Sequence, residues 1–157
     1  MVTRIFIHGL DSSNQGTKAR FFKERLPDML MPNFPGSLEE RIAILRDVLD
    51  GKSEIILVGS SFGGLMATLF TLEEEKRVKR MVLLAPALNM LDLDRYAGRT
   101  VSVPVWIYHG IHDGVIPLEE VKAIAPKLFP RLTFVELDDD HMLHTTFRDL
   151  PWDELLA

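Results

Sequence analysis

The sequence predicts one α/β domain in which a mostly parallel sheet is covered by helices on both faces. Segments that are apolar throughout alternate along the chain with segments whose apolar residues recur at helical spacing. The 157 residues are enough to bury a single core, and no internal repeat, linker or low-complexity tract divides them. We therefore expect a single three-layer domain over residues 1–157, with about six strands.

Six segments have the character of strands. They cover residues 2–7, 28–34, 55–58, 81–85, 103–108 and 132–137. The central segments 55–58 and 81–85 are uninterrupted apolar runs, which is typical of strands buried on both faces of a sheet. The segment 28–34 carries the weakest signal because it leads into a loop with Pro32 and Pro35.

The segments between these strands predict helices. They are expected over 17–26, from Ser37 to about Gly51, after residue 61, from 117 to 128, and in short form up to residue 156. Ser37 is followed three residues later by Glu40, which makes a capping box at a helix start. Pro117 suits a first helical turn. The mixed stretch 86–102 predicts no regular structure.

Composition excludes several classes of function. The net charge is -5 and no basic block is present, which argues against nucleic acid or an anionic membrane as partner. Without cysteine there is no disulfide, no thiolate metal site and no cysteine nucleophile. No signal peptide or membrane span is visible in the sequence. We therefore expect a cytoplasmic protein, with a monomer as the default state.

A G-x-S-x-G pentapeptide lies between the strand at 55–58 and the helix that follows. In this strand-turn-helix context the pattern predicts a nucleophile elbow with Ser61 at its centre. The turn is so sharp that the residues two before and two after the serine must be small, and Gly59 and Gly63 meet that demand. We expect Ser60, the preceding residue, to point inward.

The loops after the last strands carry the partners that a serine nucleophile needs. His141 follows the final strand and is the expected base, and Asp113, after the preceding strand, is the expected carboxylate that orients it. The order Ser61, Asp113, His141 is the order of the α/β nucleophile-elbow enzymes. Asp92 is the competing acid and His144 the reserve base.

The first loop predicts the oxyanion hole. In His8-Gly9-Leu10 the backbone can aim an N–H group at the substrate oxygen, and the amides of Leu10 and Phe62 together would form the hole. His8 is expected to make a hydrogen bond within this loop. Gly9 and His8 thus support the site without reacting.

Simpler structural interpretations stay open for these residues. Asp113 could only cap the following helix, and His141 could be a surface histidine in an acidic loop. The run 138–140 could suggest a metal, but three consecutive carboxylates cannot all face one ion, so we expect them to be solvated and expect no metal. A nucleotide-binding module is disfavoured because neither G-x-x-x-x-G-K-[ST] nor G-x-G-x-x-G occurs.

With these four loops in place, the chain resembles the α/β-hydrolase family over nearly its whole length. The matching stretches are 6–9, 59–64, 109–117 and the isolated His141. Residues 8–13 and 17–19 are similar to small bacterial esterases of the YqiA type. The resemblance implies a serine hydrolase that acts on carboxylic esters or thioesters without a cofactor.

The stretch 86–102 occupies the place where this family usually inserts a lid, and it is too short for one. We therefore expect small or short-chain ester substrates, in a pocket walled by residues drawn from two loops. The candidates are Met31, Phe34, Met90, Leu91 and Leu93, each of which could equally be an ordinary core residue. A thioesterase or peptidase would use the same triad, and a non-catalytic binding protein on this fold is the alternative from another class.

Overall fold

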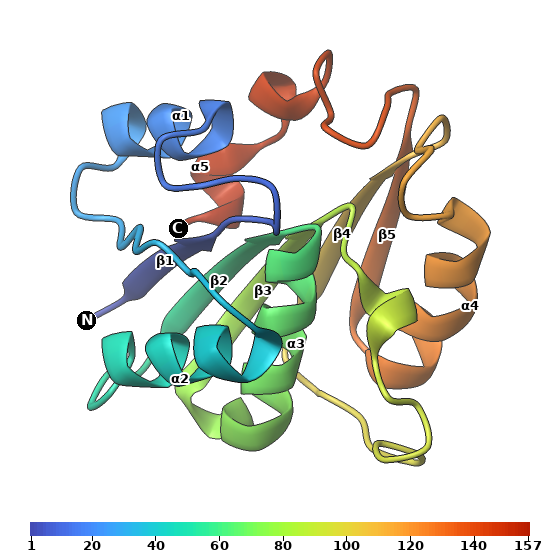
Figure 1. The fold of residues 1–157 in the computed structure, drawn as a ribbon, viewed down its shortest axis with the longest axis horizontal. Helices are drawn as coiled ribbons and strands as arrows, with labels where there is room; N and C mark the ends of the chain where they lie inside the picture. The colour runs from blue at the N-terminus through green and yellow to red at the C-terminus, as the bar shows by residue number, and fades with distance from the viewer.

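The computed structural model describes all 157 residues and contains one sheet in which every strand lies parallel beside its predecessor in sequence. The strands are β1 (Thr3–Ile7), β2 (Ile55–Ser60), β3 (Val78–Leu84), β4 (Val105–Gly110) and β5 (Leu132–Leu137). Their order across the sheet is β1-β2-β3-β4-β5 (Figure 1). Because all five run the same way, the loops that leave their carboxyl ends lie at one edge.

The helices form two layers, one on each face of the sheet (Figure 1). They are α1 (Thr17–Arg25), α2 (Leu38–Val48), α3 (Phe62–Glu74), α4 (Leu118–Leu128) and α5 (Trp152–Leu155), with 3-10 turns η1 (Glu75–Arg77), η2 (Leu88–Met90) and η3 (Phe147–Asp149). Helices α1 and α5 cover one face, whereas α2, α3 and α4 cover the other. None of these helices has the length and apolar character needed to cross a membrane.

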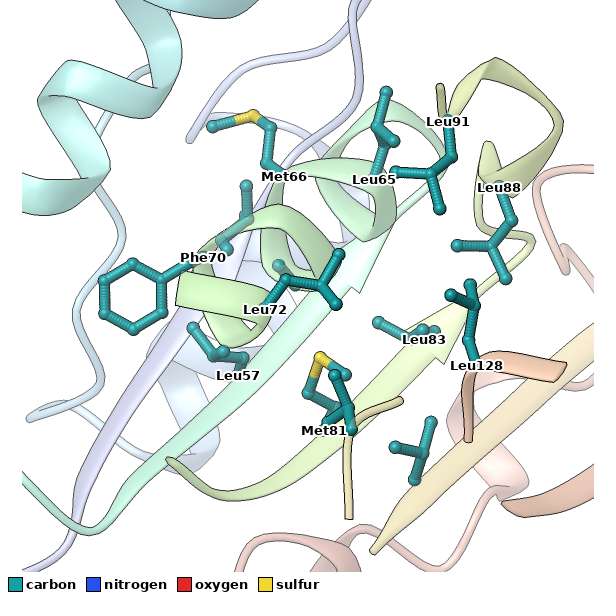
Figure 2. Close-up of a cluster of buried hydrophobic side chains, with 14 of the residues drawn as sticks. Leu57, Leu65, Met66, Phe70, Leu72, Met81, Leu83, Leu88, Leu91 and Leu128 are labelled. Atoms are coloured by element: carbon teal, nitrogen blue, oxygen red, sulfur yellow. The ribbon is translucent and has the colours of Figure 1, made fainter. Parts of the chain in front are cut away.

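Alternating side chains of the strands build a separate core on each face. In β2, Leu57 belongs to the core that includes residues of α3 and α4, whereas Val58 belongs to the core that includes residues of α1 and α5. Part of the larger core is drawn in Figure 2, where Leu57 and Met81 of the sheet lie below α3, which contributes Phe70. Every residue of β2 from Ile55 to Gly59 is buried, so the serine elbow follows the most enclosed strand. The core therefore gives the site a rigid base.

The structure contradicts the predicted sixth strand at 28–34. Only Leu30 bonds to the sheet, through its N–H to Arg4 O and its carbonyl to Phe6 N, both at 2.9 Å. This is a single bridge against β1, not a ladder. The reason is local chemistry, because Pro32 has no N–H to donate and ends the pairing. The sheet thus has five strands, not about six.

The predicted capping box at the start of α2 is confirmed. Ser37 Oγ accepts the N–H of Glu40 at 3.2 Å, and Ser37 N donates to Glu40 Oε1 at 3.1 Å. Pro117 precedes α4 as its cap instead of lying in its first turn. Within 86–102 the structure adds only the turn η2, and the rest is irregular.

Candidate active site

Ser61 stands at a strained turn between β2 and α3. Its backbone has φ 55 and ψ -116, a combination that residues with a side chain rarely adopt. The turn is held by its own backbone: Ser61 N donates to Leu84 O, and Ser61 O accepts from Gly64 N and Ala87 N, each at 2.9 Å. The hydroxyl makes no hydrogen bond within the protein. Strand, sharp turn and helix occur here as predicted.

Two glycines make this turn possible. A Cβ atom on Gly63 would lie 2.0 Å from Ile7 O, and one on Gly59 would lie 2.4 Å from Gly63 O. Both distances are far inside van der Waals contact with backbone that cannot yield. The prediction that small residues flank the serine at these positions is confirmed, and the elbow packs directly against the end of β1.

Asp113 and His141 meet at the same edge of the sheet. His141 Nδ1 donates to Asp113 Oδ2 at 2.7 Å, and the Asp113 side chain is fully buried while that of His141 is 14% exposed. The other oxygen, Oδ1, accepts the N–H groups of Val115 and Ile116, both at 2.8 Å. Asp113 therefore fixes its own loop and faces His141, so it does more than cap a helix.

The two reserve residues lie elsewhere. Asp92 is exposed, accepts the N–H of Arg95 at 3.1 Å and borders a different pocket beside α2 and α3. His144 lies in a turn before η3, not on the closing helix, and pairs with Asp140 at 2.6 Å on the surface. The His144 side chain, through this bond, lowers the pKa of Asp140 to about 2. Neither Asp92 nor His144 contacts the pair formed by Asp113 and His141.

Ser61 and His141 line one cavity of about 470 Å³ at the carboxyl edge. Its other walls come from the loop after β1, the start of α1, and the loops after β4 and β5. The lining residues are Phe6, Gly9, Asp11, Ser12, Gly16, Thr17, Lys18, Ala19, Ser60, Ser61, Val115, His141 and Met142. No hydrogen bond joins Ser61 Oγ to His141, a contact that often forms only when substrate is bound.

The interpretation of these five residues as walls of the site was wrong, whereas the alternative, ordinary core, holds for Phe34 and Leu91. None of the five candidates from the two loops lines the cavity of Ser61 and His141. Met90 and Leu91 border the separate pocket beside α2 and α3, and Phe34 is buried in the core. The exposed apolar lining comes instead from Val115, two residues after Asp113 in sequence, and from Met142, directly after His141.

The N–H groups of Leu10 and Phe62, the predicted oxyanion amides, make no hydrogen bond within the protein. His8 fixes the peptide that carries the first of them. Phe34 N donates to His8 Nε2 at 3.0 Å, so Nδ1 carries the proton and donates to Gly9 O at 2.7 Å. Since a peptide is planar and trans, the Leu10 N–H must face away from His8.

Burial lowers the pKa of His8, so its ring stays neutral and keeps this tautomer. The loop of His8 also lies against the elbow, since a Cβ on Gly9 would come within 3.4 Å of Ser61 Cβ. A residue that the sequence did not reveal, the buried Arg41 of α2, touches both amide-bearing residues. Its Nη2 donates to Leu10 O at 3.5 Å, and its guanidinium lies 5.5 Å from the centroid of the Phe62 ring.

The acidic run 138–140 is not uniformly solvated, contrary to the expectation. Asp138 is exposed and pairs with His112 at 2.9 Å. Asp139 is buried and accepts four hydrogen bonds from Asp140 N, Thr145 N, Thr146 N and Thr146 Oγ1. No group of three or more His, Cys, Asp or Glu side chains is arranged to hold a metal ion. Asp139 is therefore the anchor of the segment that carries His141.

We expect Asp139→Asn to lower the free energy of unfolding by about 2–3 kcal/mol at neutral pH, because charge-assisted hydrogen bonds are lost. Burial raises the pKa of Asp139, but the hydrogen bonds from Thr146 and its neighbours outweigh burial and hold this pKa below its usual value. The carboxylate thus stabilises the fold above the unfolded pKa, and this contribution disappears as the pH falls through the folded pKa.

Urea unfolding of wild type and Asp139→Asn at pH 7, 5 and 3.5 tests this prediction. The difference between the two proteins should stay constant from pH 7 to pH 5 and shrink below about pH 4. Asp138→Asn is the matched control, because its exposed side chain should change stability by less than about 0.5 kcal/mol. A difference that persists unchanged at the lowest pH contradicts a stabilising charge on Asp139.

Comparisons with known proteins agree on the fold. The sequence profile of the alpha/beta hydrolase fold matches residues 36–102, a stretch that includes α2, the elbow and β3. The structure is similar to alpha/beta hydrolase domain-containing protein 10 from mouse, with a TM-score of 0.81 at 17% identity over 98% of this chain and 89% of that one. Among the curated proteins, no sequence matches this chain.

Two further solved structures are similar over nearly the whole chain. Est1E from Butyrivibrio proteoclasticus gives a TM-score of 0.76 at 19% identity, covering 98% of this chain and 84% of its own. A monoacylglycerol lipase from Paleococcus ferrophilus gives 0.69 at 16% identity, covering 98% and 90%. This chain is therefore a protein of the α/β-hydrolase fold, in a minimal form with a five-stranded parallel sheet.

Proposed function

We propose that this protein is a serine hydrolase that cleaves small or short-chain carboxylic esters. The observation that carries the proposal is that the buried Asp113 carboxylate lies 2.7 Å from His141 Nδ1. His141 also lines the same cavity as Ser61. A carboxylate on Nδ1 leaves Nε2 unprotonated and able to accept a proton. Strain at Ser61 and its unpaired hydroxyl support its role as nucleophile.

The reaction then follows from these groups. Ser61 Oγ attacks the ester carbonyl as His141 Nε2 takes its proton, and the carbonyl oxygen becomes an oxyanion. The free amides of Leu10 and Phe62 stabilise that charge. The tetrahedral intermediate collapses, the C–O bond to the alcohol breaks, and His141 returns the proton to the leaving oxygen. Water, activated by His141, then releases the acid from Ser61 by the same route.

The form of the cavity supports small substrates. About 470 Å³ is open at the sheet edge, and the irregular stretch 86–102 does not line it. A long acyl chain would have few apolar walls beyond Val115 and Met142. The similarity to Est1E and to a monoacylglycerol lipase is consistent with esters as the substrate class.

We expect hydrolysis of p-nitrophenyl esters with the highest kcat/KM for acetate to butyrate. Each further methylene beyond the pocket adds no buried surface, so the value should fall or level off for longer acyl chains. Initial rates from acetate to palmitate below the micellar concentration measure this profile. A kcat/KM that rises steadily to the longest chain would contradict the short-chain proposal.

A fluorophosphonate probe separates the remaining classes when no ester is turned over. Labelling of Ser61 in a folded but inactive preparation would indicate a hydrolase with a narrow substrate, including a thioester or a peptide. Absence of labelling would favour a binding protein that uses the cavity without chemistry. Mass spectrometry of the labelled peptide identifies the residue, and the prediction is a single adduct on Ser61.

A further inference from the structure

His109 is a buried histidine to which the proposed reaction gives no role. It lies in β4, one residue before the strand ends, and its side chain is fully buried. Its Nε2 is 2.8 Å from Ile116 O and 3.2 Å from Asp113 Oδ2, the oxygen that faces His141. Two imidazoles therefore flank one carboxylate oxygen, one at the cavity and one inside the protein.

The tautomer of His109 is fixed by this arrangement. A carbonyl oxygen can only accept, so Nε2 must carry the proton that goes to Ile116 O. Nδ1 is buried and has no partner. Protonating it would bury an unpaired N–H and a charge, which is costly in the interior. The pKa of His109 is correspondingly lowered, chiefly by burial, so the ring is neutral at physiological pH.

The neutral state of the His109 ring determines which histidine the Asp113 carboxylate interacts with most strongly. An imidazolium 3.2 Å from Oδ2 would compete with His141 for the carboxylate and weaken its hold on that ring. The titratable groups that act on His109 are Asp113, which favours its protonation, and His141, which opposes it. Burial outweighs both effects. The negative charge of Asp113 is thus left to stabilise protonated His141.

His109 also closes the loop that holds the acid. Ile116 donates its N–H to Asp113 Oδ1 and accepts His109 Nε2–H at its carbonyl. The backbone N–H and C=O groups of Ile116 thereby connect the Asp113 carboxylate to the side chain of His109 in β4. Without His109 the loop 111–116 loses its only side-chain bond to the strand that it leaves. Displacement of Asp113 would then misalign His141.

We propose that His109 is a positioning residue that acts through Asp113: its neutral imidazole fixes the acid loop and keeps the carboxylate directed at His141. This inference rests on the proposed serine hydrolase. His109→Met removes the donor and roughly keeps the volume. Per active site titrated with fluorophosphonate, we expect kcat to fall about 10- to 100-fold. KM should change by less than about twofold, because His109 does not line the cavity.

Conservative variants provide rescue. In His109→Gln the amide nitrogen takes the place of Nε2 and can donate to Ile116 O, so kcat should return to within a few-fold of wild type. In His109→Asn the amide is one carbon shorter and cannot reach. If the methionine variant fails to fold, the comparison of Gln with Asn replaces it. Equal kcat per active site in the Gln and Asn variants overturns the proposal.

A further readout separates positioning from a structural role. If the carboxylate is displaced in His109→Met, the downfield proton resonance of His141 Nδ1–H should shift or broaden, whether or not a substrate is known. A variant with a lower melting temperature but an unchanged resonance and an unchanged kcat per active site would show a structural role only.

Failure of the inference on His109 can be distinguished from failure of the proposed serine hydrolase mechanism. If Ser61→Ala abolishes hydrolysis and Asp113→Asn lowers kcat by about 10⁴-fold while His109→Met leaves kcat per active site unchanged, only the inference on His109 fails. If Ser61→Ala keeps full activity, the hydrolase mechanism itself fails. In the Asp113→Asn background, His109→Met should reduce kcat by less than about twofold, since both substitutions act on one contact.

Discussion

Ser61→Ala is expected to reduce ester hydrolysis by roughly 10⁵- to 10⁶-fold, the largest effect of any single substitution in this protein. Without the hydroxyl there is no nucleophile, and the base and the oxyanion amides cannot replace it. The fold should be unaffected because Ser61 Oγ makes no hydrogen bond and the turn is held by backbone groups. To test this prediction, Ser61→Ala is measured beside wild type. The variant should keep the wild-type circular dichroism spectrum and melting temperature but lose ester turnover and fluorophosphonate labelling.

The neighbouring serine provides the matched comparison. Ser60 ends β2 and is half-buried at the border of the same cavity, but it does not occupy the strained turn position. Ser60→Ala should therefore keep kcat within a few-fold of wild type. If Ser60→Ala is the inactive variant and Ser61→Ala is active, the assignment of the nucleophile is wrong.

Asp113→Asn should lower kcat by about 10⁴-fold with little change in KM. The asparagine amide would donate to His141 Nδ1, which places the imidazole proton on Nε2. In that tautomer Nε2 cannot accept the proton of Ser61. Loop geometry should survive, because the remaining carbonyl oxygen of the amide can still accept from Val115 and Ile116, as Asp113 Oδ1 does.

Asp92→Asn is the control for the acid. Asp92 is exposed in the loop after β3 and bonds only within its own turn, so its variant should keep kcat within about twofold of wild type. Steady-state kinetics of the two asparagine variants against p-nitrophenyl butyrate decide between them. A larger loss of kcat in Asp92→Asn would move the acid to the loop after β3.

The sequence predicts the strands and the elbow well because their signals are local. An uninterrupted apolar run before Gly59 and helical spacing after Gly63 fix the strand, turn and helix without reference to distant residues. Parallel connectivity then brings the loops of Asp113 and His141 to the same edge as Ser61. Their proximity was therefore predictable from the order of the elements alone.

The features that the sequence does not reveal depend on long-range contacts. Asp139 is one of three adjacent aspartates, and only the fold decides that it points inward while Asp138 stays in water. Arg41 looks like one more polar residue of α2 until the loop after β1 is seen against it. The strand at 28–34 was predicted from composition, whereas a proline and a single neighbour limit it to one bridge.

The sequential order of the strands divides the proposed machinery between regions of unequal local stability. Ser61 follows β2, which is enclosed between two strands and buried along its length, whereas His141 follows β5, an edge strand with exposed positions that pairs only with β4. Edge elements with few partners open at lower free energy than the interior. Transient opening of β5 would therefore move His141 away from Ser61 while the strand before Ser61 stays folded. Activity would then be limited by the local stability of the edge strand β5 and not by the stability of the core.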